Sequence, residues 1–391
     1  MKKKSLLGMG ATVSIALIVL LAAGTWAPAE AAEPIKVGAV LSVTGRGGFL
    51  GTPQKKAITV MVEDLNKKGG LLGRPLEVLF EDDQSDPTNA AIAATKLIRD
   101  KQVCAIIGGS LVVSCMAIMP VCEREETVQV MIAPVTIPVK KWVFSANLTD
   151  FRLSQVMLKY TSEILKAKRI ALLNSSDTYG KNGAQGVTEN AAKYGVSVMT
   201  TEQFEPSDTS MIPQLAKVKA AKPDAIILYA NSTPAMVIAK NYQQLGMETI
   251  LVGAAGIATP DFLKSAGKLL EGKPWYLFCP KDIVADELPA NDPVRIIYEP
   301  LKKAMKDKYG DTEWQAMGRN GYDGLEVVIR GLQAAGTDNR AALRDALEKT
   351  KNIQGFVGVY NYSPTDHEGC DGSAFVSVIM KDGKYRLPPN K

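Results

Sequence analysis

Short apolar runs alternate with longer amphipathic stretches along the chain. Runs of this length that are apolar at consecutive positions are typical of strands buried on both faces of a parallel sheet. They cover residues 35–41, 76–80, 103–108, 169–173, 196–199, 225–229 and 249–253. The amphipathic stretches predict helices at residues 57–68, 89–101, 151–165, 211–221 and 235–245. This alternation indicates βαβ units that assemble into doubly wound sheets.

The alternation of predicted strands and helices is interrupted at two places. Residues 143–150 interrupt it before a new helix, and a proline-rich connection spans residues 275–293. Further helices are predicted at residues 294–308, 321–335 and 339–349, and strand-like residues at 358–360 and 374–380. A chain that leaves one α/β unit, builds a second and returns to the first predicts two lobes joined by several crossings. Ligands bind beyond the carboxyl ends of strands in open sheets, so two facing edges predict a cleft.

The first residues resemble an export signal. Lys2 to Lys4 supply positive charge, residues 6–23 are apolar, and a run of small residues follows. Ala29-x-Ala31 fits an export cleavage site, so we expect a signal peptide over residues 1–31 and a mature chain that starts at Ala32. An uncleaved membrane anchor is the alternative. The prediction is an exported, periplasmic protein.

Composition and charge exclude several classes of protein. Of the 391 residues, 46% are hydrophobic and 22% charged, as in soluble proteins. A net charge of +5 without a dense lysine and arginine stripe argues against nucleic acid as a partner. Five widely spaced cysteines without a CxxC favour buried small side chains, with one optional disulfide, over a metal or redox motif. The single histidine, His367, excludes a multi-histidine zinc site.

Enzyme motifs fail at identifiable positions. A dinucleotide-binding GxGxxG after the first strand breaks at Leu50, where the third glycine belongs. Residues 267–273 match a phosphate-binding loop until Pro274, where a hydroxyl is required. A catalytic triad would depend on His367, and the chain has no GxSxG nucleophile elbow. We therefore expect neither an enzyme nor a cofactor.

Several short motifs, taken in order along the mature chain, resemble one family. They are residues 35–45, 64–73, 82–87 and 106–108, Asp177-Thr178-Tyr179-Gly180, and Gly321-Tyr322-Asp323-Gly324. As a set they resemble the type I periplasmic substrate-binding proteins of branched-chain amino acid ABC transporters. The resemblance implies an α/β fold with two doubly wound parallel-sheet lobes and a three-crossing hinge. It implies an N-terminal lobe of residues 32–149 and 279–358, and a C-terminal lobe of residues 150–278 and 359–391.

The resemblance also locates candidate ligand contacts in the N-terminal lobe. Family members bind the ligand carboxylate with a Ser/Thr-rich loop, which here covers residues 108–115. Leu111 and Val112 stand where the family usually has serines, and Ser110 and Ser114 flank them, so we expect a weaker anion site. The alternative is that both serines only cap the following helix. Thr136 keeps the hydroxyl of a second family segment.

In the first loop, Arg46 is a candidate to hold a carboxylate, and Phe49 or Leu50 occupies a position where the family often places a ring. In the far lobe, the resemblance assigns Tyr179, Asn231 and Ser232 to the ligand. The alternatives are a solvated arginine for Arg46 and packing roles for both aromatic residues.

Ala255 stands where amino-acid binders often carry the acid that pairs with the ligand ammonium. A buried ammonium without a partner costs several kcal/mol, so Ala255 argues against a zwitterionic ligand. We therefore expect an organic or aromatic acid as the ligand. A monomeric receptor is expected to bind it without chemical change and to deliver it to the membrane permease of an ABC importer. Ligand closes the cleft through its extra contacts in the closed state. The alternatives are a branched-chain or other amino acid as ligand, and a sensor that docks on a membrane receptor.

Overall fold

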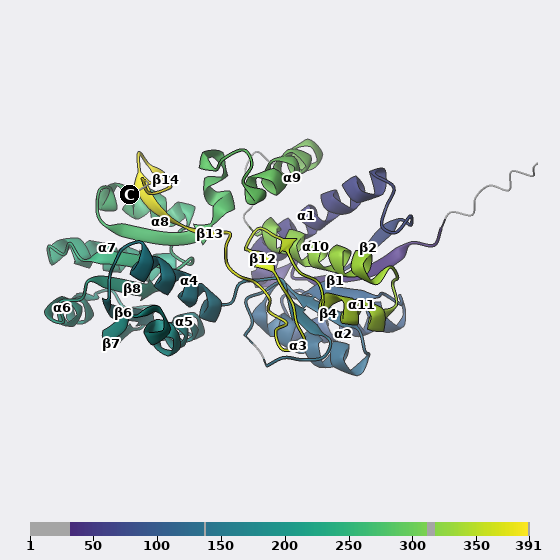
Figure 1. Cartoon of the computed structure of the whole chain (residues 1–391), viewed down its shortest axis with the longest axis horizontal. Helices are drawn as coiled ribbons and strands as arrows, with labels where there is room; N and C mark the ends of the chain where they lie inside the picture. Colours follow the sequence, from purple (N-terminus) through teal and green to yellow (C-terminus); the bar gives the residue numbers. More distant parts are fainter. Residues whose placement is uncertain (1–31, 137, 311–316, 390–391) are drawn as a thin grey trace, which may run out of the picture.

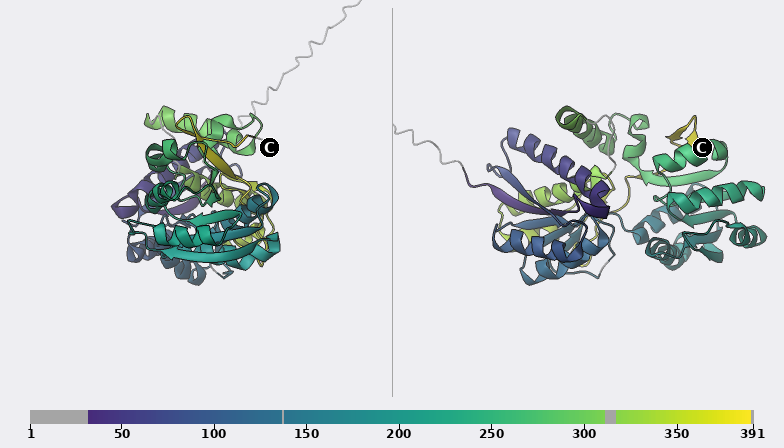
Figure 2. Two further views of the ribbon diagram at one scale, coloured as in Figure 1. Left: turned by 90° about the vertical axis from the view of Figure 1, so that its left-hand side faces the viewer. Right: turned by 180° about the vertical axis from the view of Figure 1, so that it is seen from behind.

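The computed structural model describes residues 32–136, 138–310 and 317–389, and the predicted signal peptide lies outside them. The described chain forms two α/β lobes that lie side by side and are joined by a narrow hinge (Figure 1; Figure 2). Each lobe is built around its own sheet, with helices on both faces. The predicted fold class, two doubly wound lobes, is confirmed.

The N-terminal lobe contains a five-stranded parallel sheet in the order β2-β1-β3-β4-β5. Its strands are β1 (Ile35–Leu41), β2 (Leu76–Asp82), β3 (Ala105–Gly108), β4 (Val128–Met131) and β5 (Val143–Ser145). Its helices are α1 (Gly48–Lys67), α2 (Pro87–Arg99), α3 (Val112–Arg124), α9 (Pro293–Tyr309), α10 (Gly318–Ala335) and α11 (Arg340–Leu347), with η1 (Gly45–Gly47) before α1. A short ribbon of β11 (Ile353–Gln354) and β12 (Val359–Tyr360) packs beside α10.

The C-terminal lobe contains a seven-stranded sheet in the order β14-β13-β10-β9-β8-β6-β7. Its strands are β6 (Arg169–Ser175), β7 (Ser197–Phe204), β8 (Ala225–Tyr229), β9 (Ile250–Gly253), β10 (Trp275–Pro280), β13 (Phe375–Lys381) and β14 (Lys384–Arg386). Its helices are α4 (Asp150–Glu163), α5 (Thr178–Asn190), α6 (Ile212–Ala220), α7 (Ser232–Gln244) and α8 (Pro260–Leu270), with η2 (Ala191–Tyr194) after α5. Strands β13 and β14 are antiparallel additions to an otherwise parallel sheet.

Strand β10 corrects one expectation. The sequence predicted a proline-rich connection over residues 275–293, but Trp275–Pro280 is a strand between β9 and β13. Trp275, Leu277 and Cys279 are fully buried, and burial of a large apolar side chain contributes about 1.5–3 kcal/mol. Proline is tolerated at the end of this strand because no further ladder bond is needed there. The connection proper is shorter and contains η3 (Lys281–Glu287).

Three segments connect the lobes. The first is residues 146–149, between β5 and α4, and the second runs from η3 to α9. The sequence placed the third near residue 358, yet residues beyond it contact the N-terminal sheet. Tyr362 Oη donates to the Ser145 carbonyl at 2.8 Å, and the Ser145 amide donates to the His367 carbonyl at 2.8 Å. We therefore propose that the third connection lies between Cys370 and Phe375, where β13 begins.

No helix among the described residues is long and apolar enough to cross a membrane. All five cysteines fall within the described chain, and each is a buried free thiol.

Candidate ligand-binding site

The predicted ligand contacts gather at the carboxyl ends of neighbouring strands. Arg46, Phe49 and Leu50 follow β1, the loop with Ser110, Val112 and Ser114 follows β3, and Thr136 follows β4. These three strands are adjacent in the N-terminal sheet. In the other lobe Tyr179 follows β6, Asn231 and Ser232 follow β8, and Ala255 follows β9, again three adjacent strands.

The two edges meet at the first connection. Ser145 ends β5, and Tyr229, the last residue of β8, donates its hydroxyl to the Asp150 carbonyl at 3.1 Å. Five residue steps separate Ser145 from Asp150 and span at most roughly 18 Å. The carboxyl edges of both sheets therefore lie at the same hinge, with the candidate residues on either side of it.

The loop after β3 is held by buried side chains. The hydroxyl of Ser110 donates to Gln54 Oε1 at 2.6 Å and accepts from the Ser42 amide at 3.0 Å. Gln129 Nε2 donates to the carbonyls of Gly108 and Cys115, at 3.0 and 3.1 Å. Both glutamines are fully buried. The loop is thus fixed before any ligand arrives, and the Ser110 hydroxyl is occupied inside the lobe.

Neither candidate serine caps α3, so that alternative is wrong. The N-cap residue is Leu111, which supplies no side-chain hydrogen bond, and Ser114 Oγ is fully buried without a partner. The first-turn amides of a helix have no acceptors within the helix. The start of α3 therefore keeps unsatisfied donors and the positive end of the helix dipole, which together favour an anion.

Apolar and cationic candidates lie in α3 itself and in the segments that follow the adjacent strands β1 and β4. Phe49 is 69% exposed and Val112 45% exposed, while Leu50 is half-buried. Arg46 is exposed. Thr136 is also exposed. Since the opposite lobe does not cover Phe49 or Val112, the cleft is open.

The C-terminal edge is organised around one tyrosine. Tyr179 is half-buried, and its hydroxyl accepts from the Gly256 amide at 3.0 Å. Its ring packs edge-on against Tyr229, with centroids 5.7 Å apart. Burial is the main cause that raises the pKa of Tyr179, so its hydroxyl stays neutral. Gly256 also lies against Asn231, because a Cβ there would stand 2.8 Å from Asn231 Oδ1.

Helix α7 begins beside this tyrosine without a side-chain cap. Its N-cap residue Asn231 is exposed, and Ser232 and Ala255 are half-buried. The neighbouring helix α5 is capped, since Asp177 accepts from the Gly180 amide at 2.8 Å. The free amides of α7 therefore offer hydrogen-bond donors to a ligand that reaches the C-terminal lobe.

Sequence reasoning missed Asp150. This residue opens α4 at the hinge, and burial together with the nearby Asp177 raises its pKa to about 7. Its charge also contributes to the raised pKa of Tyr179, which places it at the same sheet edge. A helix start normally favours a carboxylate, so the raised pKa reflects strong desolvation. Nothing in the local sequence distinguishes Asp150 from a helix-capping aspartate.

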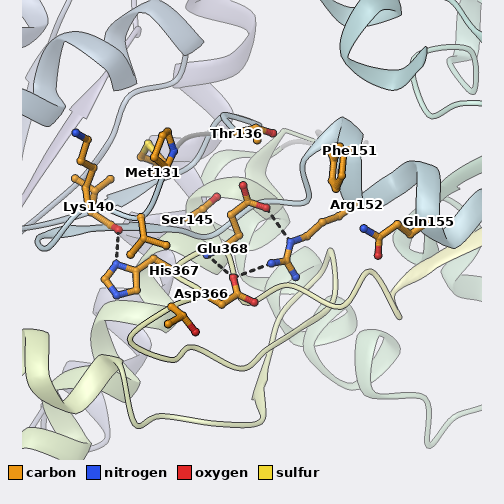
Figure 3. A pocket seen from close by; sticks show the side chains of 14 residues that line it. Met131, Thr136, Lys140, Ser145, Phe151, Arg152, Gln155, Asp366, His367 and Glu368 are labelled. Atoms are coloured by element: carbon orange, nitrogen blue, oxygen red, sulfur yellow. Dashed lines mark hydrogen bonds and ion pairs between the residues drawn. The ribbon is translucent and has the colours of Figure 1, made fainter. Parts of the chain in front are cut away.

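A cavity of about 460 Å³ opens beside the hinge (Figure 3). Thr136 is the predicted contact that lines it, together with Phe151, Arg152 and Gln155 from α4. The facing wall is formed by Asp366, His367 and Glu368. The cavity therefore lies between groups that belong to both lobes.

Among the described residues, no group of three or more His, Cys, Asp or Glu side chains could hold a metal ion. The arrangement offers helix amides, a cation and apolar surface on one side, and tyrosine, amide and carboxyl groups on the other. These groups can bind and orient a small molecule. The fold and site therefore define a two-lobed solute-binding protein.

Comparison with known proteins gives the family. The family described as "Periplasmic binding protein" matches residues 34–384, and the chain belongs to it. The Leu/Ile/Val-binding protein homolog 3 of Brucella melitensis biotype 1 is 25% identical over 338 residues, covering 85% of this chain and 88% of the relative. The Leu/Ile/Val-binding protein of Escherichia coli K12 is 25% identical over 306 residues, covering 77% and 80%.

A solved structure agrees in fold. An extracellular ligand-binding receptor from Rhodopseudomonas palustris HaA2 is 28% identical, with a TM-score of 0.71 over 91% of this chain and 100% of that chain. The chain is thus a type I periplasmic binding protein of the branched-chain amino acid transporter group. Its relatives are substrate-binding proteins and not enzymes.

Proposed function

We propose that the protein binds a small organic acid, with an apolar or aromatic body, between its lobes. The observation that carries the proposal is the uncapped start of α3, and the exposed Arg46 lies on the loop after the adjacent strand β1; both features favour a carboxylate. Phe49 and Val112 supply apolar surface at the same edge. Ala255 supports a ligand without an ammonium group, because the alanine side chain offers no negative charge to pair with one.

An amino acid is the second candidate. The names of two relatives state that they bind leucine, isoleucine and valine. Asp150 also favours this candidate, because its carboxyl group lies near Asp177 and Tyr179 and would gain from a cationic partner. The two candidates differ by one functional group, the ligand ammonium, and this difference makes them separable.

The proposed cycle involves no covalent step. Ligand first contacts one lobe, and contacts with the second lobe exist only after closure. Only this difference in affinity moves the equilibrium toward the closed state. We propose that the closed monomer then docks on the membrane permease of an ABC importer, and that the chain is exported to the periplasm with cleavage after Ala31. A sensor that docks on a membrane receptor would use the same closure.

A thermal-shift screen tests the proposal. Acids, their amides and amino acids are compared, because a ligand at a hundredfold excess over its Kd should raise the Tm by roughly 5–10 °C. We expect short aliphatic or aromatic acids to shift the Tm and their amides to do so far less. Arg46→Ala should weaken an acid at least about tenfold and leave the amide unchanged. An equal loss for acid and amide removes Arg46 from the site.

A further inference from the structure

An arginine near the start of α4 links two segments of the hinge. It lies just after the first connection, and its partners lie just before the third. Arg152 donates from Nη2 to Asp366 Oδ1 at 2.7 Å and from Nε to Glu368 Oε2 at 2.8 Å. Its Nη1 donates to the Cys370 carbonyl at 3.2 Å. Figure 3 shows the guanidinium between the two carboxylates at the edge of the hinge cavity. All three guanidinium nitrogens of Arg152 therefore donate hydrogen bonds to the same segment, residues 366–370.

The acidic partners move with the N-terminal lobe. Their segment is fixed to β5 by the hydrogen bond from the Ser145 amide to the His367 carbonyl. His367 Nδ1 lies 3.0 Å from the Val143 carbonyl, and the imidazole stacks on Phe144 with centroids 4.0 Å apart. These contacts leave the segment little freedom to follow the other lobe.

The arginine moves with the C-terminal lobe. Tyr229 of β8 donates its hydroxyl to the carbonyl of Asp150, two residues before Arg152. Helix α4 also packs tightly on α5, because a Cβ on Gly186 would lie 2.5 Å from Ser154 Oγ. The three contacts of Arg152 consequently cross from one lobe to the other.

These contacts are partly shielded from water. The side chains of Arg152 and Glu368 are 28% and 17% exposed, and that of Asp366 is 36% exposed. Asp366 also accepts from the amides of Glu368 and Gly369, at 3.1 and 3.0 Å, so its carboxylate is held in place. An arginine fork bound to fixed carboxylates tolerates little displacement, so a rotation of one lobe against the other strains or breaks the set.

We propose that Arg152, with Asp366 and Glu368, is an interlobe latch that favours the open cleft and thereby lowers the affinity for the ligand. The inference rests on the proposed binding function, because the latch regulates the same cleft. Closure has to break or distort the latch, and part of the ligand's differential affinity is used for that step. Arg152 is thus a positioning residue that acts through the relative position of the two lobes.

Arg152→Gln and Glu368→Gln test the latch. Fluorescent dyes on one introduced cysteine in each lobe, at the exposed positions Lys101 and Lys240, report closure in the ligand-free protein by single-molecule energy transfer. Each latch variant should raise the closed fraction about three- to tenfold. The Kd for 3-phenylpropanoate or leucine, whichever binds, should fall by the same factor, because apparent affinity scales with the competent fraction. The double variant should add little to either single variant.

Arg169→Gln is the matched control. Arg169 Nη2 pairs with Asp224 Oδ1 at 2.8 Å within the C-terminal lobe, away from the connections. This variant should leave both the closed fraction and the Kd unchanged. An unchanged or lower closed fraction in Arg152→Gln overturns the latch. Failure of every acid and amino acid to bind the wild type contradicts the proposed function instead, and the closed fraction of the ligand-free protein still decides on the latch.

Discussion

At the scale of single residues, the buried polar groups around the β3 loop have distinct tasks. Ser110 and Ser114 are four positions apart and both buried, but only Ser110 has partners. Sequence reasoning expected a loop after residue 108, which lies between β3 and α3, and it treated the two serines as equivalent. Their difference depends on Gln54, which comes from a separate helix, so local sequence could not reveal it. Asp150 was missed for the same reason, because its desolvation is set by tertiary packing.

The two serines should respond differently to truncation. Ser110→Ala leaves the Ser42 amide and Gln54 Oε1 without their partner, and a buried group left unpaired costs about 1–3 kcal/mol. Ser114→Ala removes a hydroxyl that has no partner, so its cost should stay below about 1 kcal/mol. Urea unfolding of both variants measures the difference. Equal free energies of unfolding would contradict the role assigned to Ser110.

At the scale of elements, one carboxyl group on α10 accepts hydrogen bonds from the short ribbon of β11 and β12 and from the turn between these strands. Asp323 is fully buried and accepts from the Phe356 amide at 2.8 Å, the Val357 amide at 3.2 Å and Tyr360 Oη at 2.7 Å.

Most strands and helices were predictable because their apolar periodicity is strong, and residues 35–41 match β1 at both ends. Strand β10 was not, because aromatic residues followed by proline have no clear period. The start of α1 at Gly48 was also missed, since glycine and proline disfavour helix.

Asp323 should make stability depend on pH. Burial is the largest cause that raises its pKa to about 7, against the lowering effect of its three donors. Between about pH 4 and 7 the unfolded chain loses this proton while the folded chain keeps it, so the contribution to the free energy of unfolding falls as pH rises. Relative to Asp323→Asn, the wild type should lose on the order of 2–4 kcal/mol over this range. A pH-independent difference in chemical denaturation would show that Asp323 is ionised throughout.

At the scale of the whole molecule, two lobes and a hinge follow from the order of strands and helices along the chain. That order could be predicted from the sequence. The position that we propose for the third connection could not be predicted, because it rests on contacts of Tyr362 and His367 with β5, which lies far away in sequence. The hinge cavity and the latch were equally hidden, since Arg152 and Glu368 are more than two hundred residues apart. The openness of the cleft follows from the exposed Phe49 and Val112.

Ligand should make the molecule more compact. Closure brings Phe49 and Val112 under the opposite lobe, so the radius of gyration in small-angle X-ray scattering should decrease when a bound acid is saturating. An amide that does not bind provides the control. A bound acid that leaves the scattering curve unchanged would argue against closure around the ligand.

The central claim is that the cleft selects a carboxylate and does not require an ammonium group. Calorimetric titration with matched pairs tests it most directly: leucine against 4-methylpentanoate, and phenylalanine against 3-phenylpropanoate, each pair differing only in the amino group. We predict that the acid of at least one pair binds at least about tenfold more tightly than its amino acid, because Ala255 leaves an ammonium unpaired. Tighter binding of the amino acid in both pairs would contradict the claim and favour Asp150 as the partner of the ammonium group.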